Sequence, residues 1–411
     1  MIDLFRSENV VVRRAPAEDV SRWVVTFDNY GIGHGFDRPG FGEEFLRQSG
    51  VSAIHVMGRQ EDWYQYPEMA EAMAAVRAAT AGAERVMTYG SSMGGYAALR
   101  FADAAGANAV LAISPQYSID PLKAPFEARW PQDSQRIHWL PEIDDRLVCQ
   151  ARPVVVFDPT IEDGLQAALI RQDIDICAIR LPYVSHPATT YLSEVGLLKA
   201  LVLQTLTGEL ETASFARDAR RRRNKSGVYM STLATIQPAH RRGLALSLAQ
   251  GAVTANPGNP ISGVTLARLL SLEGRHDEAV ERLERILAST DRAPIYLMAY
   301  VDVLVAAGRH GEARPHAREA VEAFAHLAHL HVWEAALLHE ANEKAAAIAA
   351  VKRAIALDPQ QPHYSQLLQQ YRRGGGRKGS DRRGLASLVS RTLMRLTARG
   401  RSPAVEGGGK A

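Results

Sequence analysis

The sequence is poor in cysteine, in aromatic residues and in long apolar runs. Its two cysteines, Cys149 and Cys177, have no second cysteine or histidine at metal-ligand spacing. This argues against a disulfide scaffold or a metal site, and we expect reduced structural thiols in a cytoplasmic protein. No apolar run approaches the length of a membrane span, and Met1-Ile2-Asp3-Leu4-Phe5-Arg6 does not resemble a signal peptide.

The net charge is also small, at +3, but it is unevenly distributed. Arginines crowd the stretch 217–225 and the chain beyond residue 371. The chain has 411 residues, which is long enough for two or more domains. Hydrophobic residues make up 46% and charged residues 23%, which is ordinary for a globular protein.

In the region 1–210, short apolar runs alternate with amphipathic segments. Strands are predicted at 9–13, 23–27, 51–57, 85–89, 109–113, 153–157 and 174–180. Helices are predicted at 67–80, 165–171 and 191–206. This alternation predicts an α/β domain with a mostly parallel sheet and helices on both faces. An irregular stretch at 115–150 interrupts it, and its aromatic residues either line a pocket or pack a long loop.

A Gly-x-Ser-x-Gly pattern, Gly90-Ser91-Ser92-Met93-Gly94, lies between a predicted strand and a predicted helix. A serine at such a turn has a strained backbone, and close passage of strand and helix requires neighbours without side chains. The pattern resembles the nucleophile elbow of the α/β-hydrolase superfamily. The resemblance implies that Ser92 is a nucleophile and that the Met93 N–H faces an oxyanion. The alternative is a glycine-rich turn without chemistry.

The resemblance also implies that an acid and then a histidine follow the nucleophile along the chain. His186 follows the strand at 174–180 and is the predicted base. Asp163 and Asp158 both follow the strand at 153–157. We favour Asp163 as the acid, with Asp158 as the alternative, although Asp163 in an N-cap role alone would explain its position equally.

A second oxyanion N–H is implied in the loop after the strand at 23–27. Many members of the superfamily have a His-Gly pair there, whereas this chain has Asp28-Asn29-Tyr30-Gly31. We assign the role to Asn29, with Tyr30 as the alternative. The cluster Trp63-Tyr64-Gln65-Tyr66 follows another strand near this rim, and either substrate stacking or core packing would explain it.

The second half contains a repeat of 34 residues. Gly274-Arg275-His276-Asp277-Glu278-Ala279 recurs as Gly308-Arg309-His310-Gly311-Glu312-Ala313, and a third copy has Asn342 and Ala347 in the matching positions. The pattern resembles a tetratricopeptide repeat (TPR), an all-α solenoid of paired helices. We expect three repeats and a partial leading unit over 230–371, with a groove for a protein or peptide partner. A rigid spacer or dimerisation arm is the alternative.

Two basic segments flank these repeats. We expect 211–229 to be an exposed linker. The tail 372–411 combines a glycine-rich basic hinge with an amphipathic, arginine-rich segment at 384–400. Such a tail suggests an anionic membrane surface, which would place the protein peripherally at the inner membrane face, or docking back on the repeats. No nucleic-acid partner is expected, because no recognised module is present.

These features predict a serine hydrolase of the esterase or deacylase type, joined to a TPR module. Its substrate would be an ester, thioester or amide, and no cofactor or metal is required. One alternative is an acyltransferase or deacylase acting on a glycan. Another is a non-catalytic TPR adaptor with an inactive hydrolase domain.

Overall fold

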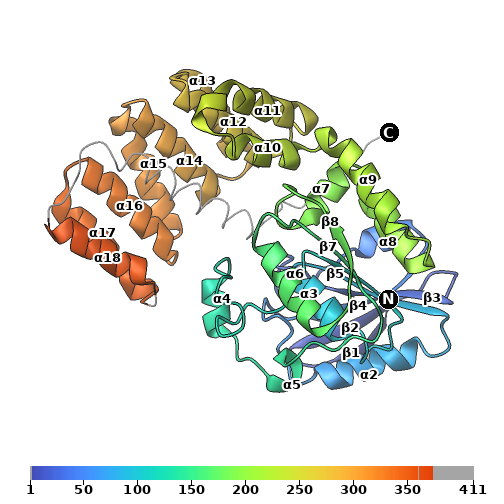
Figure 1. Ribbon diagram of the computed structural model, residues 1–411. Helices are drawn as coiled ribbons and strands as arrows, with labels where there is room; N and C mark the ends of the chain where they lie inside the picture. Colours follow the sequence, from blue (N-terminus) through green and yellow to red (C-terminus); the bar gives the residue numbers. More distant parts are fainter. Residues whose placement is uncertain (1, 360, 374–411) are drawn as a thin grey trace. The chain divides into compact units, whose positions relative to one another are not determined.

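The computed structural model of the chain describes residues 2–359 and 361–373. The fold divides into two compact units, the first ending at Ile236 and the second beginning at Gln237 (Figure 1). The segment expected at 384–400, with the membrane role suggested for it, lies outside the described residues. No helix in the described part of the chain is long and apolar enough to cross a membrane.

The first unit is built around an eight-stranded sheet with the order β1-β2-β4-β3-β5-β6-β7-β8. The pairs β1–β2 and β2–β4 are antiparallel, and all other pairs are parallel. The mostly parallel sheet is therefore confirmed. Its strands are β1 (Ile2–Arg6), β2 (Val10–Ala15), β3 (Arg22–Phe27), β4 (Ser52–Gly58), β5 (Arg85–Ser91), β6 (Ala109–Ile113), β7 (Val154–Phe157) and β8 (Cys177–Arg180). The sequence did not predict β1, an edge strand with no buried residue.

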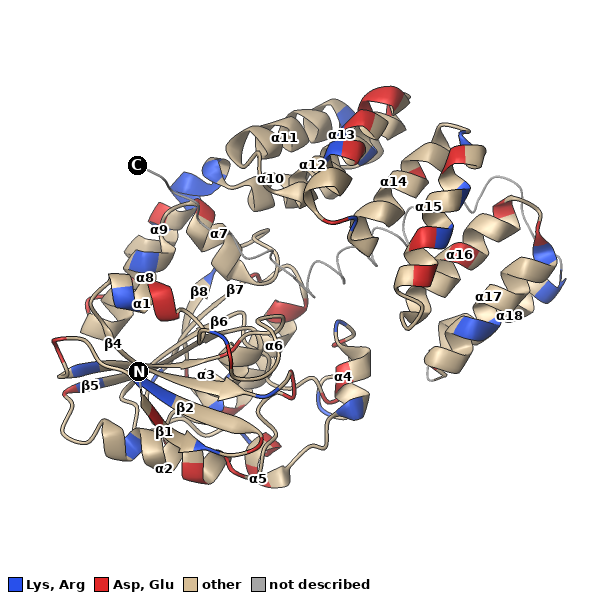
Figure 2. Ribbon diagram, turned by 180° about the vertical axis from the view of Figure 1, so that it is seen from behind, with Lys and Arg blue, Asp and Glu red and all other residues tan. Residues whose placement is uncertain are grey.

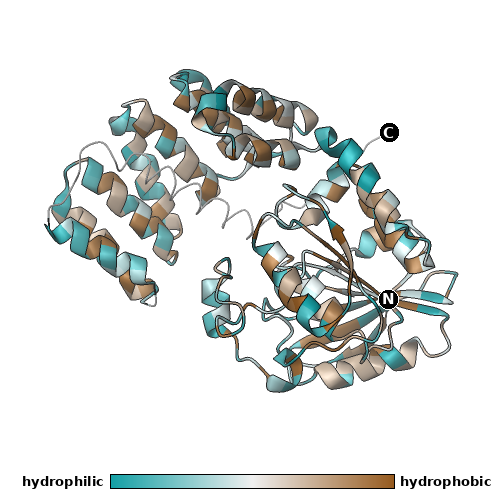
Figure 3. Cartoon of the chain, in the orientation of Figure 1, coloured by the Kyte–Doolittle hydropathy of each residue, from teal (hydrophilic) through white to brown (hydrophobic). Residues whose placement is uncertain are grey.

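Helices cover both faces of this sheet, because its strands are apolar on both sides (Figure 3). In β3, Trp23 and Val25 pack with α2 and α3 on one face, whereas Val24 packs with α8 and α9 on the other. The helices of this unit are α1 (Glu43–Gln48), α2 (Met69–Ala79), α3 (Met93–Arg100), α4 (Pro131–Arg136), α5 (Pro141–Asp144), α6 (Glu162–Asp173), α7 (Ala188–Glu194), α8 (Leu198–Thr207), α9 (Thr212–Arg222), η1 (Arg223–Lys225) and α10 (Gly227–Thr235).

Two expectations for this unit are wrong. The helix predicted at 191–206 is interrupted at Gly196, which has φ +68° and separates α7 from α8. The linker predicted at 211–229 is folded, because α9 buries Phe215 and Ala219 against the sheet unit. These two residues lie one helical turn apart, whereas Arg217, Arg220 and Arg221 of α9 are exposed. Figure 2 colours the basic residues of this helix blue. The helix α10, which includes the residues expected to begin the repeats, also belongs to this unit.

The second unit is an all-α solenoid in which consecutive helices pack against one another. The short η2 (Ala239–Arg241) precedes eight α-helices in the described residues: α11 (Arg242–Ala255), α12 (Pro260–Leu272), α13 (His276–Ser289), α14 (Pro294–Ala306), α15 (His310–Ala323), α16 (Ala328–Glu340), α17 (Lys344–Leu357) and α18 (Pro362–Arg373). The helical solenoid expected from the repeat is therefore confirmed.

The repeated small residues have the structural roles that their positions predict. Gly274, Gly308 and Asn342 have φ of +77°, +75° and +63°, and each lies just after the first helix of a pair. This left-handed conformation ends a helix and suits glycine or asparagine. The alanines early in the second helix of each pair, Ala279, Ala313 and Ala347, are buried, so that the paired helices approach closely.

Candidate active site

The turn at Ser92 joins β5 to α3 at the carboxyl end of the sheet. Ser92 has φ +54° and ψ −120°, a conformation that a residue with a side chain rarely adopts. A Cβ atom on Gly90 would collide with the backbone of Gly94, and one on Gly94 would collide with the carbonyl oxygen of Phe27. Both glycines are therefore required by close backbone approach, and the second brings the start of α3 against the end of β3.

The structure brings Ser92, His186 and Asp163 together. Ser92 Oγ lies 2.8 Å from His186 Nε2, and His186 Nδ1 lies 2.9 Å from Asp163 Oδ1. An ionised carboxylate only accepts hydrogen bonds, so Nδ1 carries the proton and Nε2 accepts from the Ser92 hydroxyl. Ser92 is 4% exposed and His186 7% exposed, which strengthens these interactions by excluding water.

The other candidate acid, Asp158, does not contact the imidazole. Its Oδ1 accepts hydrogen bonds from the N–H and hydroxyl of Thr160, and its Oδ2 accepts the Ser185 N–H at 2.9 Å. Asp158 therefore holds the turn after β7 and the loop that precedes His186. Asp163 lies in the first turn of α6, whose N-cap is Ile161, so N-capping does not explain its position.

The electrostatics of Asp163 are set by two neighbouring nitrogen groups. Burial raises its pKa, but His186 and the Arg129 guanidinium lower it by more, so that the pKa is about 2. Arg129 Nη1 lies 2.7 Å from Asp163 Oδ1, and Arg129 also forms a two-point ion pair with the buried Glu127. Asp163 is therefore ionised over the whole physiological pH range.

The predicted oxyanion donors are placed by the same backbone contact. Met93 is the first residue of α3, so its N–H has no acceptor one turn earlier in that helix. The close approach of Gly94 to Phe27 and Asp28 brings the following residue, Asn29, to the same end of the sheet. The Asn29 side-chain amide donates to the Tyr30 carbonyl at 2.9 Å.

Two polar side chains at the site were not predicted. Gln116 Nε2 lies 3.4 Å from Ser92 Oγ, while Gln116 Oε1 accepts the Trp63 indole N–H. Because Gln116 closely follows β6, its place beyond a strand end was a usable signal. Arg129 lies in the irregular stretch 115–150, where no periodicity singles it out.

The aromatic residues near the site are mostly packed against one another. The ring centroids of Trp63 and Trp130 lie 5.4 Å apart, and Trp130 also meets the edge of His186 at 5.5 Å. Trp63 and Tyr64 are at most 1% exposed, so core packing explains the cluster that follows β4. Trp130 connects the irregular stretch directly to the histidine.

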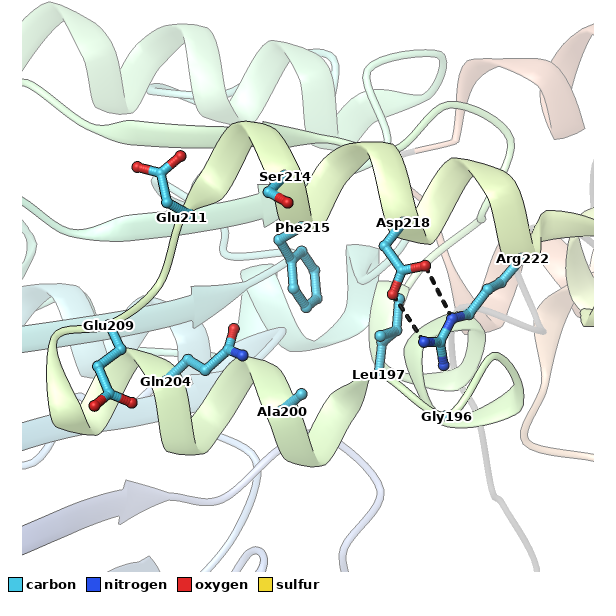
Figure 4. Close-up of a pocket in the computed structure, with 10 residues that line it drawn as sticks. All are labelled: Gly196, Leu197, Ala200, Gln204, Glu209, Glu211, Ser214, Phe215, Asp218 and Arg222. Atoms are coloured by element: carbon cyan, nitrogen blue, oxygen red, sulfur yellow. Dashed lines mark hydrogen bonds and ion pairs between the residues drawn. The ribbon is translucent and has the colours of Figure 1, made fainter.

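A separate groove lies between α8 and α9, with a volume of about 360 Å³. Figure 4 shows its lining, including the ion pair between Asp218 and Arg222. None of the residues placed around Ser92 lines it. Across 2–359 and 361–373, no group of three or more His, Cys, Asp or Glu side chains is arranged to hold a metal ion.

Comparison with known families identifies the repeats. The family model of the tetratricopeptide repeat matches residues 239–300, so the C-terminal unit contains tetratricopeptide repeats. No curated protein matches the chain significantly.

Several solved structures are similar to part of the chain. YrrB, described as a TPR protein with an unusual peptide-binding site, has 13% identity and a TM-score of 0.31, over 44% of this chain and 90% of its own. A thermophilic TPR protein of Thermus thermophilus has 22% identity and a TM-score of 0.31, over 44% and 94%. MamA from Desulfovibrio magneticus has 19% identity and a TM-score of 0.27, over 42% and 98%.

Proposed function

We propose that the sheet unit is a serine hydrolase of the α/β-hydrolase type, which cleaves an ester, thioester or amide. The observation that carries the proposal is the pair of hydrogen bonds that links Ser92 Oγ to His186, at 2.8 Å, and His186 to Asp163, at 2.9 Å. The order Ser, Asp, His along the chain and the strained turn after β5 support the same function.

In this mechanism the imidazole of His186 takes the Ser92 proton as Oγ attacks the carbonyl carbon. Asp163 keeps Nδ1 protonated and stabilises the imidazolium that forms. The N–H groups of Met93 and Asn29 donate to the oxyanion of the tetrahedral intermediate. His186 then gives its proton to the leaving group, and an acyl group remains on Ser92. Water activated by His186 releases the acid, or an alcohol such as a sugar hydroxyl accepts the acyl group.

The test is labelling of the full chain with a fluorophosphonate probe, which reacts with an activated serine. Wild type is expected to label, and Ser92→Ala and His186→Ala are expected not to. Ser91→Ala is the matched control, because Ser91 Oγ lies 3.5 Å from Thr189 Oγ1 and makes no contact with the histidine. Absence of labelling in folded wild-type protein would favour the non-catalytic adaptor instead.

We further propose that the repeats bind a protein or peptide partner of the hydrolase. The repeat match at 239–300 supports this role, since stacked helix pairs of this kind present extended binding surfaces. Cross-linking of the full chain in a lysate, compared with a variant that carries substitutions only on the repeat surface, tests it. Loss of the same cross-linked partner in that variant, with labelling of Ser92 unchanged, is the expected result.

A further inference from the structure

A cation, Arg129, lies against Asp163, the acid hydrogen-bonded to His186. Asp163 Oδ1 accepts both His186 Nδ1 at 2.9 Å and Arg129 Nη1 at 2.7 Å. The Arg129 side chain is 5% exposed, and it comes from the stretch between β6 and β7 rather than from α6. A Ser-His-Asp arrangement needs no such cation to orient its histidine.

The guanidinium is held rigidly in this position. Its Nε lies 2.8 Å from Glu127 Oε1 and its Nη2 2.5 Å from Glu127 Oε2, a planar two-point pair. Gln166 on α6 donates to Glu127 at 3.1 Å. The Arg129 Cζ atom also lies 4.7 Å from the centre of the Trp130 ring, whose edge-on partner is His186.

The charged groups near His186 come from three elements. Asp163 contacts the ring from α6, Arg129 and Glu127 approach from the stretch between β6 and β7, and Asp158 acts from the end of β7 through Ser185. A negative charge near the imidazole favours its protonated form and a positive charge disfavours it. Arg129 therefore opposes the effect of Asp163, and Glu127 offsets part of the effect of Arg129.

We propose that Arg129 is a positioning residue that holds the Asp163 carboxylate and opposes its charge at the imidazole of His186, with Glu127 as its counter-charge. The inference depends on the serine hydrolase function proposed above. A histidine must be neutral to take the proton of a serine, so the charges around the imidazole influence where activity falls at acid pH. Arg129 thereby extends the activity of the enzyme towards lower pH.

The experiment measures kcat/KM for p-nitrophenyl acetate against pH in the full chain. Arg129→Gln is expected to move the acid-side midpoint up by roughly one pH unit, because a cation next to the acid is lost. Glu127→Gln is expected to move it in the opposite direction, and the double variant to return it towards wild type. Arg129→Lys, which keeps the charge but loses the two-point pair with Glu127, is expected to move the midpoint less than Arg129→Gln does.

Arg136→Gln is the matched control, because Arg136 lies in the same stretch but pairs with Asp62 and Asp133. Its midpoint is expected to equal that of wild type. The acid-side midpoint of kcat/KM does not depend on how much of the protein is folded. If Arg129→Gln does not fold, the near-isosteric Glu127→Gln variant provides the test. Unmoved midpoints in active Arg129→Gln and Glu127→Gln would overturn this inference alone, whereas inactive wild type would overturn the hydrolase proposal.

Discussion

The two units are assembled from contacts of very different range along the chain. In the sheet unit, the hydrogen bond from Ser92 to His186 joins residues 94 positions apart, and the hydrogen bond from Trp63 to Gln116 joins residues 53 positions apart. In the solenoid, Asp302 bonds Arg268 one repeat earlier and Trp333 one repeat later. Residues in the repeats therefore meet their neighbours by periodicity, whereas the candidate site depends on the whole topology of the sheet.

Asp163 and Asp302, whose side chains are 0% and 24% exposed, show the same contrast in electrostatic terms. The pKa of Asp163 is held at about 2, because the effects of His186 and Arg129 outweigh its burial. Burial raises the pKa of Asp302, and its single cation, Arg268, compensates only in part. The neighbours of Asp163 in the sheet unit thus favour its ionised form, whereas Asp302 in the solenoid accepts a hydrogen bond from Trp333.

The strongest test of this contrast replaces each acid by its amide. Asp163→Asn is expected to lower kcat for p-nitrophenyl acetate by about 10³ to 10⁴, because the amide favours the wrong tautomer of His186. Asp302→Asn, in the solenoid, is expected to leave kcat unchanged. Asp158→Asn serves as the control within the sheet unit, and a loss in that variant equal to the loss in Asp163→Asn would contradict the assignment of the acid.

The glycines provide the next comparison, in stability. Gly90→Ala is expected to cost roughly 3 kcal/mol or to prevent folding, because its Cβ would collide with the backbone of Gly94. Gly274→Ala is expected to cost about 1 kcal/mol, because Gly274 has a positive φ but no atom within 4 Å of an added Cβ. Urea unfolding followed by circular dichroism measures both, and equal costs would show that close backbone approach does not dominate at the turn.

Acid pH is expected to weaken the sheet unit through Asp163. Its folded pKa of about 2 lies below the ordinary value of 3.8, so its stabilising contribution is present above pH 3.8 and is lost as the pH falls towards 2. The loss amounts to about 2 kcal/mol. Urea unfolding by tryptophan fluorescence in a Trp333→Phe background reports on this unit alone, since the other four tryptophans lie in it.

The control for that measurement is Asp163→Asn in the same background, in which this part of the acid dependence is expected to disappear. An unchanged acid dependence would show that other carboxyl groups control the stability of the unit. Asp302 has the opposite sign, because a raised pKa means that acidification relieves the cost of an ionised acid. Asp302→Asn is therefore expected to remove a small gain in solenoid stability at acid pH.

Sequence patterns predicted the parts of the molecule that local physics controls. Short apolar runs predicted seven of the eight strands, and the 34-residue spacing predicted the helix pairs. The turn at Ser92 could be predicted because its glycines and serine lie within five consecutive residues, Gly90 to Gly94. Arg129 and Gln116 could not be predicted with the same ease, because their roles arise from contacts made only after the sheet is formed. The helix α9 was predicted to be an exposed linker because it is rich in arginine and its buried residues are only Phe215 and Ala219.

The smallest expected effect on stability is that of replacing a residue of one repeat by the residue at the equivalent position of another. Gly308→Asn is expected to change the free energy of unfolding by only a few tenths of a kcal/mol, because Asn342 adopts the same left-handed conformation, with φ +63°, at the equivalent position. Gly308→Ala is expected to cost about 1 kcal/mol, since alanine gains no local hydrogen bond in that conformation. Urea unfolding of both variants measures the difference. Because the position repeats every 34 residues, a residue found in one copy is expected to be tolerated in another, which no position of the Ser92 turn permits.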